Sequence, residues 1–173
     1  MVEESVEVPQ GLTTDGLLGR RYLARGIDSV CILLLIGAFF LIEGAILSPV
    51  TQSSSLLLTV LNLPLLVILW IGYGAAFESS AAQATPGKRL MGIRVYDARG
   101  ERPDFFQAAR RNLVKDGPFL LISFIPGGRL LSLLWLIAHL VVMHRSPVYQ
   151  AIHDRFASTW VAAPEATTQL HIA

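Results

Sequence analysis

The stretch Gly19-Arg20-Arg21-Tyr22-Leu23-Ala24-Arg25-Gly26-Ile27-Asp28 leads into fourteen residues, from Ser29 to Ile42, that carry no charge. At about 3.6 residues per turn, Arg21, Arg25 and Asp28 share one face of a helix. A carboxylate at the head of an apolar run is costly in a bilayer, so Asp28 is expected to have a partner and is a candidate functional residue. The alternative is an interfacial ion pair, in which Asp28 only neutralises Arg21 or Arg25.

The composition is that of a membrane protein. Of the 173 residues, 53% are hydrophobic and only 16% are charged, against about 25% charged residues in soluble chains. The apolar residues are grouped in blocks, which is typical of a polytopic protein of one domain. The net charge of +1 does not indicate nucleic acid as a partner. Cys31 is the only cysteine, which excludes a disulfide framework and a cysteine-based metal site.

The N-terminal half predicts two membrane helices. Residues 1–14 are acidic and polar and predict a disordered tail without the features of a signal peptide, so the first apolar run serves as its own insertion signal. The first helix is expected to begin near Asp15, as N-cap, and to run to about Leu47. The second, Leu56 to Phe77, is long enough to span a membrane.

Polar residues interrupt both of these apolar segments. Pro64 frees a carbonyl in the second helix, and Asn62 could bond that carbonyl or a neighbouring helix. Glu43 returns to the helix face of Arg25 and lies about 22 Å from Asp28 along the axis. It is a secondary site candidate, with a plain residue of the outer membrane surface as the alternative.

The following region is polar and basic. Turn-forming residues at 83–88, an alternating segment at 90–96 and a turn at 97–100 predict a short strand and a tight turn, or a small β-hairpin on the cytosolic face. Residues 105–115 predict an amphipathic helix at the membrane surface. The excess of basic residues between Lys88 and Lys115 predicts weak, salt-dependent binding of anionic lipid.

Two arrangements fit residues 117–143. They form either a single broken span or a hairpin of two helices that turns at Pro126-Gly127-Gly128. A spanning third helix must then begin near Ala108, because the residues from 118 to 125 cover only about 12 Å of a core of about 30 Å. With four spans, every basic residue except Arg129 falls on one side of the membrane. The positive-inside rule therefore favours four segments, or three segments of which the last is re-entrant, and both termini are expected in the cytosol.

Four motifs in this order resemble the RDD family of membrane proteins. They are Arg21-x-x-Ala24-x-x-Ile27-Asp28, then Gln83-x-Thr85-Pro86-Gly87-Lys88 with Gly92-Ile93-Arg94-Val95, then Gln107-Ala108-Ala109-Arg110-Arg111-Asn112, and finally His153-Asp154-Arg155-Phe156-Ala157-Ser158-Thr159-x-Val161. The expected fold is an all-α polytopic bundle of three to four transmembrane helices. The membrane domain would cover residues 15–162, between the tail 1–14 and a flexible tail at 163–173.

The opening and closing motifs are expected to form one polar site at the inner membrane boundary, because pairing lowers the cost of bringing ions out of water. The candidates are Arg21, Asp28, Arg111, His153 and Asp154, with Arg25, Glu43, Glu78 and His139 as secondary candidates. Arg21–Asp154 or Arg111–Asp28 is the expected cross-helix contact, and Arg21–Asp28 and Arg25–Asp28 are the local alternatives. His139 could relay protons, or it bonds a neighbouring helix.

The resemblance leaves the activity open. It implies transport of an unknown ligand, and monovalent cation/proton exchange has been proposed for some members. One hypothesis is thus a small transporter or transporter subunit of the inner membrane, with Asp28 as its titrating group. Since no internal repeat is present, it would act as a homo-oligomer or with a partner membrane protein. The other is a scaffold, assembly factor or accessory subunit. No nucleophile, phosphate-loop or metal motif indicates an enzyme or a cofactor.

Overall fold

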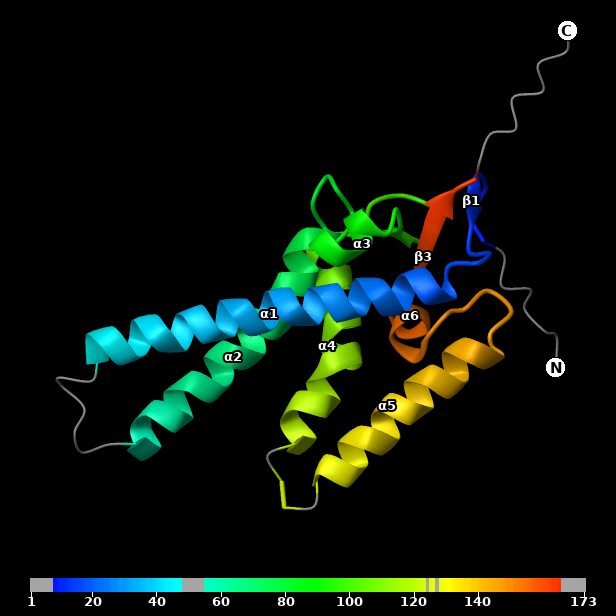
Figure 1. The fold of residues 1–173 in the computed structure, drawn as a ribbon. Helices are drawn as coiled ribbons and strands as arrows, with labels where there is room; N and C mark the ends of the chain where they lie inside the picture. Colours follow the sequence, from blue (N-terminus) through cyan, green and yellow to red (C-terminus); the bar gives the residue numbers. More distant parts are fainter. Residues whose placement is uncertain (1–7, 48–54, 124, 127, 166–173) are drawn as a thin grey trace, which may run out of the picture.

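The protein is mostly helical with one small sheet. The computed structural model describes residues 8–47, 55–123, 125–126 and 128–165. Along the chain the elements are β1 (Leu12–Thr13), α1 (Leu18–Leu47), α2 (Ser55–Glu78), α3 (Pro86–Leu90), β2 (Arg94–Asp97), α4 (Phe105–Ser123), α5 (Gly128–Arg145), α6 (Ile152–Phe156) and β3 (Thr159–Pro164). The four long helices extend from a compact end that holds α3, α6 and the strands (Figure 1).

The first two helices match their predicted ranges closely. α1 begins at Leu18 and not at Asp15, so Asp15 is not its N-cap, and it ends at Leu47 as expected. α2 contains Pro64. Asn62 bonds the neighbouring helix, because its Nδ2 donates to Oε1 of Glu43 at 2.7 Å. Each of these two polar side chains thereby satisfies the other within apolar surroundings.

Residues 105–145 form a helical hairpin. The segment predicted as a separate surface helix is the first part of α4, which continues through Pro118 to Ser123. α5 begins at Gly128, so of the two arrangements considered for this region the hairpin is correct. Gly128 is required there, because a Cβ at this position would lie 1.7 Å from the carbonyl oxygen of Ile122.

The predicted β-hairpin within the basic loop is wrong. β2 pairs antiparallel with β3, from the C-terminal segment, and β3 pairs with β1, which gives the order β1-β3-β2. The predicted turn after β2 does form, since Oδ1 of Asp97 accepts hydrogen bonds from the backbone N–H groups of Arg99 and Glu101. The chain then proceeds to α4. β1 lies within the predicted tail 1–14, whose residues 1–7 fall outside the described ranges.

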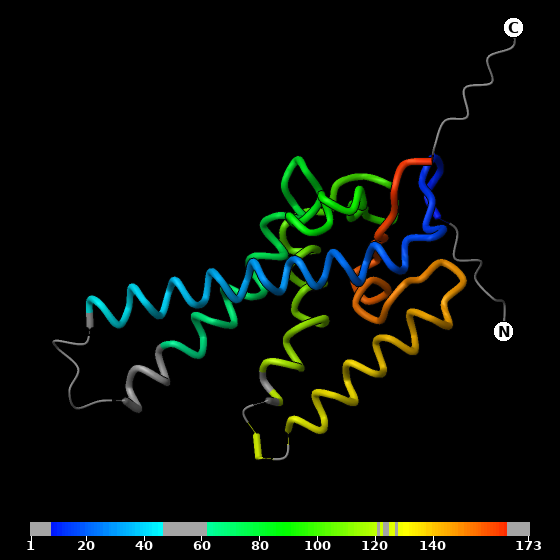
Figure 2. The backbone as a smooth tube through the Cα atoms, viewed as in Figure 1, coloured from blue at the N-terminus to red at the C-terminus, as the bar shows by residue number. Residues whose placement is uncertain are grey.

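The sheet packs against the start of α1. Ile93, Val95 and Val161 are buried with Leu17 and Ala24 in one apolar cluster. Because Leu12 pairs with Pro164, the two ends of the described chain lie at the same end of the molecule, which the tube in Figure 2 shows. This packing fixes the N-terminal end of α1 against the segments that carry the closing motif.

Large apolar side chains are exposed along α1 and α5. Two helical segments among the described residues are long and apolar enough to cross a membrane, Leu18–Ile46 with mean hydropathy 2.4 and Gly128–Arg145 with mean hydropathy 1.2. Asn62–Glu78 of α2 is a shorter apolar helix. Only 6% of the most apolar window in the first segment is buried inside the protein, as expected of a helix that faces lipid.

Candidate functional site

Arg111 of α4 is the centre of a buried network of ion pairs. Its side chain is 2% exposed. Nε and Nη2 donate to Oδ1 of Asp154 at 2.9 and 2.7 Å, and Nη1 donates to Oε1 of Glu78 at 2.7 Å. Both acids are fully buried. The guanidinium therefore links the end of α2 to α6 through α4, and its several N–H groups let one arginine reach two acids at once.

Two more cations extend this network. Nη2 of Arg21 donates to Oδ2 of Asp154 at 2.5 Å, and Nη1 donates to the carbonyl of Tyr149 at 2.7 Å. Lys88 forms an ion pair with Oε1 of Glu78. The resulting ion-pair chain, Lys88–Glu78–Arg111–Asp154–Arg21, joins α3, α2, α4, α6 and α1. The predicted Arg21–Asp154 contact is thus confirmed.

Burial and pairing set the ionisation of this chain. Burial raises the pKa of Asp154, but the cations of Arg21 and Arg111 outweigh it and hold the pKa well below its usual range. Burial lowers the pKa of Lys88 to about 7, and the Glu78 carboxylate only partly opposes it. Asp154 is therefore a fixed negative charge, and Lys88 is the more easily neutralised member of the ion-pair chain.

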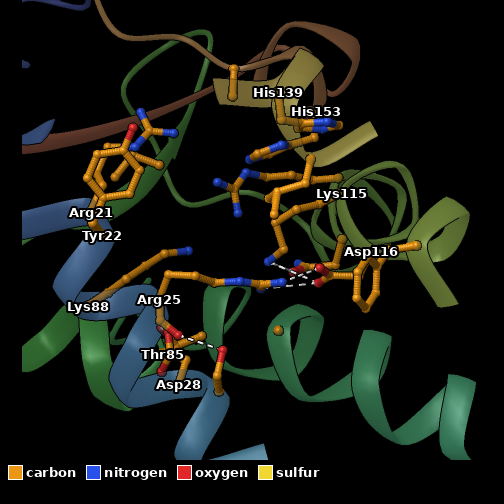
Figure 3. A pocket seen from close by; sticks show the side chains of 18 of the residues that line it. Arg21, Tyr22, Arg25, Asp28, Thr85, Lys88, Lys115, Asp116, His139 and His153 are labelled. Carbon is orange, nitrogen blue, oxygen red and sulfur yellow. Dashed lines mark hydrogen bonds and ion pairs between the residues drawn. The ribbon is translucent and has the colours of Figure 1, made fainter. Parts of the chain in front are cut away.

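A second cluster of charged side chains is centred on Asp116. Arg25 of α1 forms an ion pair with Asp116 of α4. Lys115 also reaches Asp116, with Nζ at 3.4 Å from Oδ2, and donates to Oδ1 of Asn112 at 2.5 Å. In Figure 3, Arg25 and Lys115 converge on Asp116. We call these three residues the Asp116 cluster.

Among the described residues, Asp28 contacts neutral donors and no cation. Its carboxylate accepts hydrogen bonds from the Thr85 hydroxyl at 2.5 Å, the backbone N–H of Gly87 at 2.9 Å and the Tyr73 hydroxyl at 3.3 Å. Asp28 is 6% exposed, and no ion pair within the described ranges involves it.

The other expected partners of Asp28 bind elsewhere. Three predicted contacts of Asp28 are wrong, because each arginine extends to an acid on a different helix. They are Arg111–Asp28, Arg21–Asp28 and Arg25–Asp28. Helical spacing places Arg21, Arg25 and Asp28 on one face of α1, but that face meets several elements at once. The long arginine side chains therefore pair across helices and leave Asp28 to the loop before α3.

Asp28 acts as an N-terminal cap of α3. Thr85 occupies the N-cap position without a side-chain cap bond, and Pro86 occupies the first turn. The N–H of Gly87 is one of the donors that a helix leaves unpaired at its start, and Asp28 supplies the acceptor from α1. Gly87 permits this approach, because a Cβ there would lie 2.2 Å from the Ala24 carbonyl oxygen and 2.9 Å from Oδ1 of Asp28.

We expect Gly87→Ala to destabilise the protein by about 1–3 kcal/mol, because the added methyl group forces α3 away from α1. The Asp28 cap is then lost as well. Melting temperature in detergent measures the effect. Gly72→Ala is the matched control, since a Cβ at Gly72 meets no atom within 4 Å. Equal melting temperatures for the two variants would show that α3 does not depend on close contact with α1.

These groups surround a cavity of about 420 Å³ between α1, α2, α4 and α5. Its wall contains the three cations of the ion-pair chain, the Asp116 cluster and Asp28. Figure 3 shows Asp28 and Thr85 together, at a distance from the His139–His153 pair. The remaining wall is aromatic and apolar. It contains Ile32, Trp70, Tyr73, Phe119, Trp135, Leu136, Leu140 and Met143. The cavity therefore combines charged and apolar surfaces.

Two histidines and two tryptophans of the wall have open ring nitrogens. The rings of His139 and His153 stack with centroids 5.1 Å apart. Nδ1 of His139 bonds the Trp135 carbonyl of its own helix at 3.1 Å. The predicted alternative to a proton relay was instead a bond from His139 to a neighbouring helix. Four ring nitrogens are buried without a hydrogen-bond partner in the described part of the chain, namely Nε2 of His139, Nδ1 of His153 and Nε1 of Trp70 and Trp135. Burial lowers the pKa of His153 well below its usual range, so this imidazole is neutral.

The structure brings most of the predicted site residues together. The ion-pair chain contains or adjoins five of them, Arg21, Arg111, His153, Asp154 and Glu78. The cavity is lined by three more, Asp28, Arg25 and His139. Glu43 lies apart, on the α1–α2 contact with Asn62. Sequence reasoning missed the roles of Thr85, Tyr73 and Asp116. Only Thr85 had a usable signal, because it stands in the turn motif before α3.

Within the described residues, no group of three or more His, Cys, Asp or Glu side chains is arranged to hold a metal ion. Comparison with protein families gives one match. The model described as the RDD family matches residues 16–158, which is most of the chain. No curated protein and no solved structure matches the sequence.

Proposed function

The chain belongs to the RDD family, and on this premise we propose that it is a small multi-pass membrane transporter, or a subunit of one, in which Asp28 binds a proton and a monovalent cation in turn. The observation that carries the proposal is the ionic environment of Asp28. Among the acids in and around the cavity, Glu78, Asp116 and Asp154 each have cationic partners, whereas Asp28 has none in the described ranges.

A buried carboxylate without a cationic partner favours uptake of a positive charge, because burial of an uncompensated ion is costly. The surroundings of Asp28 suit a small cation as well as a proton. The hydroxyl oxygens of Thr85 and Tyr73 lie within hydrogen-bonding distance of the carboxylate, and oxygen atoms are the ligands that hard cations prefer. A proton and a cation would therefore compete for one site.

The arrangement of the elements supports a membrane topology with both termini in the cytosol. The β1–β3 pair holds the two ends of the described chain together, which favours an even number of crossings. α1, α2, α4 and α5 would supply four crossings. All basic residues except Arg129 then lie on one side, as the positive-inside rule demands of an inner-membrane protein. We propose that the basic side contacts anionic lipid and that the chain works as an oligomer or with a partner membrane protein.

The ion-pair chain favours a second candidate function, a non-transporting scaffold or accessory subunit. It fastens five elements with charges that each have a partner of opposite sign. In that case Asp28 would only fasten α3 to α1. The two functions differ in one property, because only the transporter requires Asp28 to bind an ion.

Cation-dependent melting of the purified protein tests the proposal. At fixed ionic strength, replacing N-methylglucamine by Na⁺, K⁺ or Li⁺ should raise the melting temperature for at least one of these ions, by about 3–5 °C at roughly ten times the dissociation constant. The rise should vanish in Asp28→Asn. It should persist in Glu101→Gln, whose parent side chain is 67% exposed. No rise in the wild type, or the same rise in both variants, would favour the scaffold.

A further inference from the structure

We propose that the cavity binds a small organic anion with an apolar body, and that the ion at Asp28 controls its affinity. The coupling rests on the proposed function, whereas the anion site rests on its own observations. They are the charge balance of the wall, the buried N–H groups of two tryptophans that lack a partner in the described structure, and the apolar part of the wall.

The charge balance of the wall is positive on both sides of the cavity. The ion-pair chain contains three cations, Arg21, Lys88 and Arg111, and two acids. The Asp116 cluster contains two cations and one acid. Each therefore carries one positive charge in excess when all members are ionised, which for Lys88, with its pKa lowered to about 7, holds below neutral pH. Asp28 carries the only opposing unpaired charge among the described wall residues. An anion placed between the two groups would be attracted by both.

The tryptophans supply donors that lack an acceptor. Nε1 of Trp70 in α2 and of Trp135 in α5 are buried without a hydrogen-bond partner in the described structure, and both indoles line the cavity. An indole nitrogen can only donate, and a buried donor without an acceptor costs about 1–3 kcal/mol. Oxygen atoms of a bound anion would satisfy these groups once the indoles turn their N–H groups toward the ligand, whereas a purely cationic ligand would leave them unpaired.

The size and the apolar part of the wall define the rest of the ligand. Ile32, Phe119, Leu136 and Leu140 give the cavity wall an apolar part. A volume of about 420 Å³ lies within the range of small-molecule pockets. A compact carboxylate or phosphate with one aromatic or aliphatic body fits these limits.

Asp28 couples this site to the proposed ion exchange. Its negative charge in the same wall opposes an anion, and a proton or a monovalent cation removes that opposition. Coupling between two binding sites is reciprocal, so the anion must raise the affinity of Asp28 for its ion by the same factor. The anion and the ion at Asp28 would then bind cooperatively.

The test compares three probes of one shape on the full-length protein in detergent. They are 3-phenylpropionate, 3-phenylpropanol and 3-phenylpropylamine, and binding is measured by calorimetry at neutral pH. We expect the carboxylate to bind at least tenfold more tightly than the amine and the alcohol. Arg25→Gln should weaken carboxylate binding about tenfold, because it removes the excess charge of the Asp116 cluster. Arg25 is suited to this change, since its side chain is 43% exposed.

Two more variants and a control complete the test. Trp70→Phe should weaken carboxylate binding several-fold while it keeps an aromatic ring in the wall. Asp28→Asn should strengthen it about tenfold, as a neutral mimic of the occupied state. Arg99→Gln should leave it unchanged, since Arg99 is 78% exposed and lies outside the cavity.

The outcomes separate the anion site from the exchange at Asp28. Equal affinities of the carboxylate and the amine, or no effect of Arg25→Gln, would overturn the anion site even if cation-dependent melting succeeds. Carboxylate binding that Asp28→Asn leaves unchanged would overturn the coupling alone. Stabilisation by phosphatidylglycerol nanodiscs with no binding of the soluble probe would show that a lipid headgroup occupies the cavity, and would overturn the proposal of a small free ligand.

Discussion

Replacing Arg111 by methionine is expected to lower the free energy of unfolding by roughly 3–5 kcal/mol, which is the usual cost of removing one partner from a buried ion pair. Arg111 donates to both Glu78 and Asp154, and both acids are fully buried. After the substitution, Lys88 and Arg21 at the ends of the ion-pair chain are the remaining arginine or lysine partners of these acids. The ion pairs from α4 to α2 and α6 would be lost together.

Arg110→Met is the matched control for this prediction. Arg110 precedes Arg111 in α4, is exposed and lies over the ring of Phe156 with a distance of 5.8 Å to the centroid. Its replacement should cost less than about 1 kcal/mol. Chemical denaturation of both variants in the same detergent gives the comparison. Similar losses for the two arginines would mean that the buried network does not hold the elements together.

The helices and the location of the charged site could be predicted from local sequence. The apolar blocks define α1 and α2 to within a few residues, because burial in lipid requires long uncharged segments. The need to neutralise buried charges predicted the contact between Arg21 and Asp154, although 133 positions separate them in the sequence. Pro126-Gly127-Gly128 indicated a turn because proline and glycine interrupt helices there.

The partners of individual side chains could not be predicted in the same way. β2 found its partner strand more than sixty residues later, and β propensity within the loop cannot specify a pairing over that distance. Asp28 was expected to meet an arginine, but its acceptor capacity is used by Thr85, Gly87 and Tyr73. That outcome depends on the close approach of Gly87 to α1, which only the packed structure defines.

Asp28→Asn is expected to abolish transport and to leave the fold intact. Asparagine keeps a side-chain oxygen that can accept from the N–H of Gly87, so the cap of α3 is retained. It cannot take up a proton or neutralise a cation, so both halves of the proposed exchange are lost. The melting temperature without added cation should therefore match that of the wild type, while the activity falls to the level of protein-free vesicles.

The most direct test of exchange at Asp28 is a measurement of internal pH in proteoliposomes after a pulse of Na⁺, K⁺ or Li⁺. Wild-type protein should couple the inward movement of at least one cation to the outward movement of protons and raise the internal pH. Asp28→Asn, reconstituted at equal density, should give no change, and Glu101→Gln should behave as wild type. An equal pH change in Asp28→Asn and wild-type vesicles, or none with any cation in the wild type, would contradict ion exchange at Asp28.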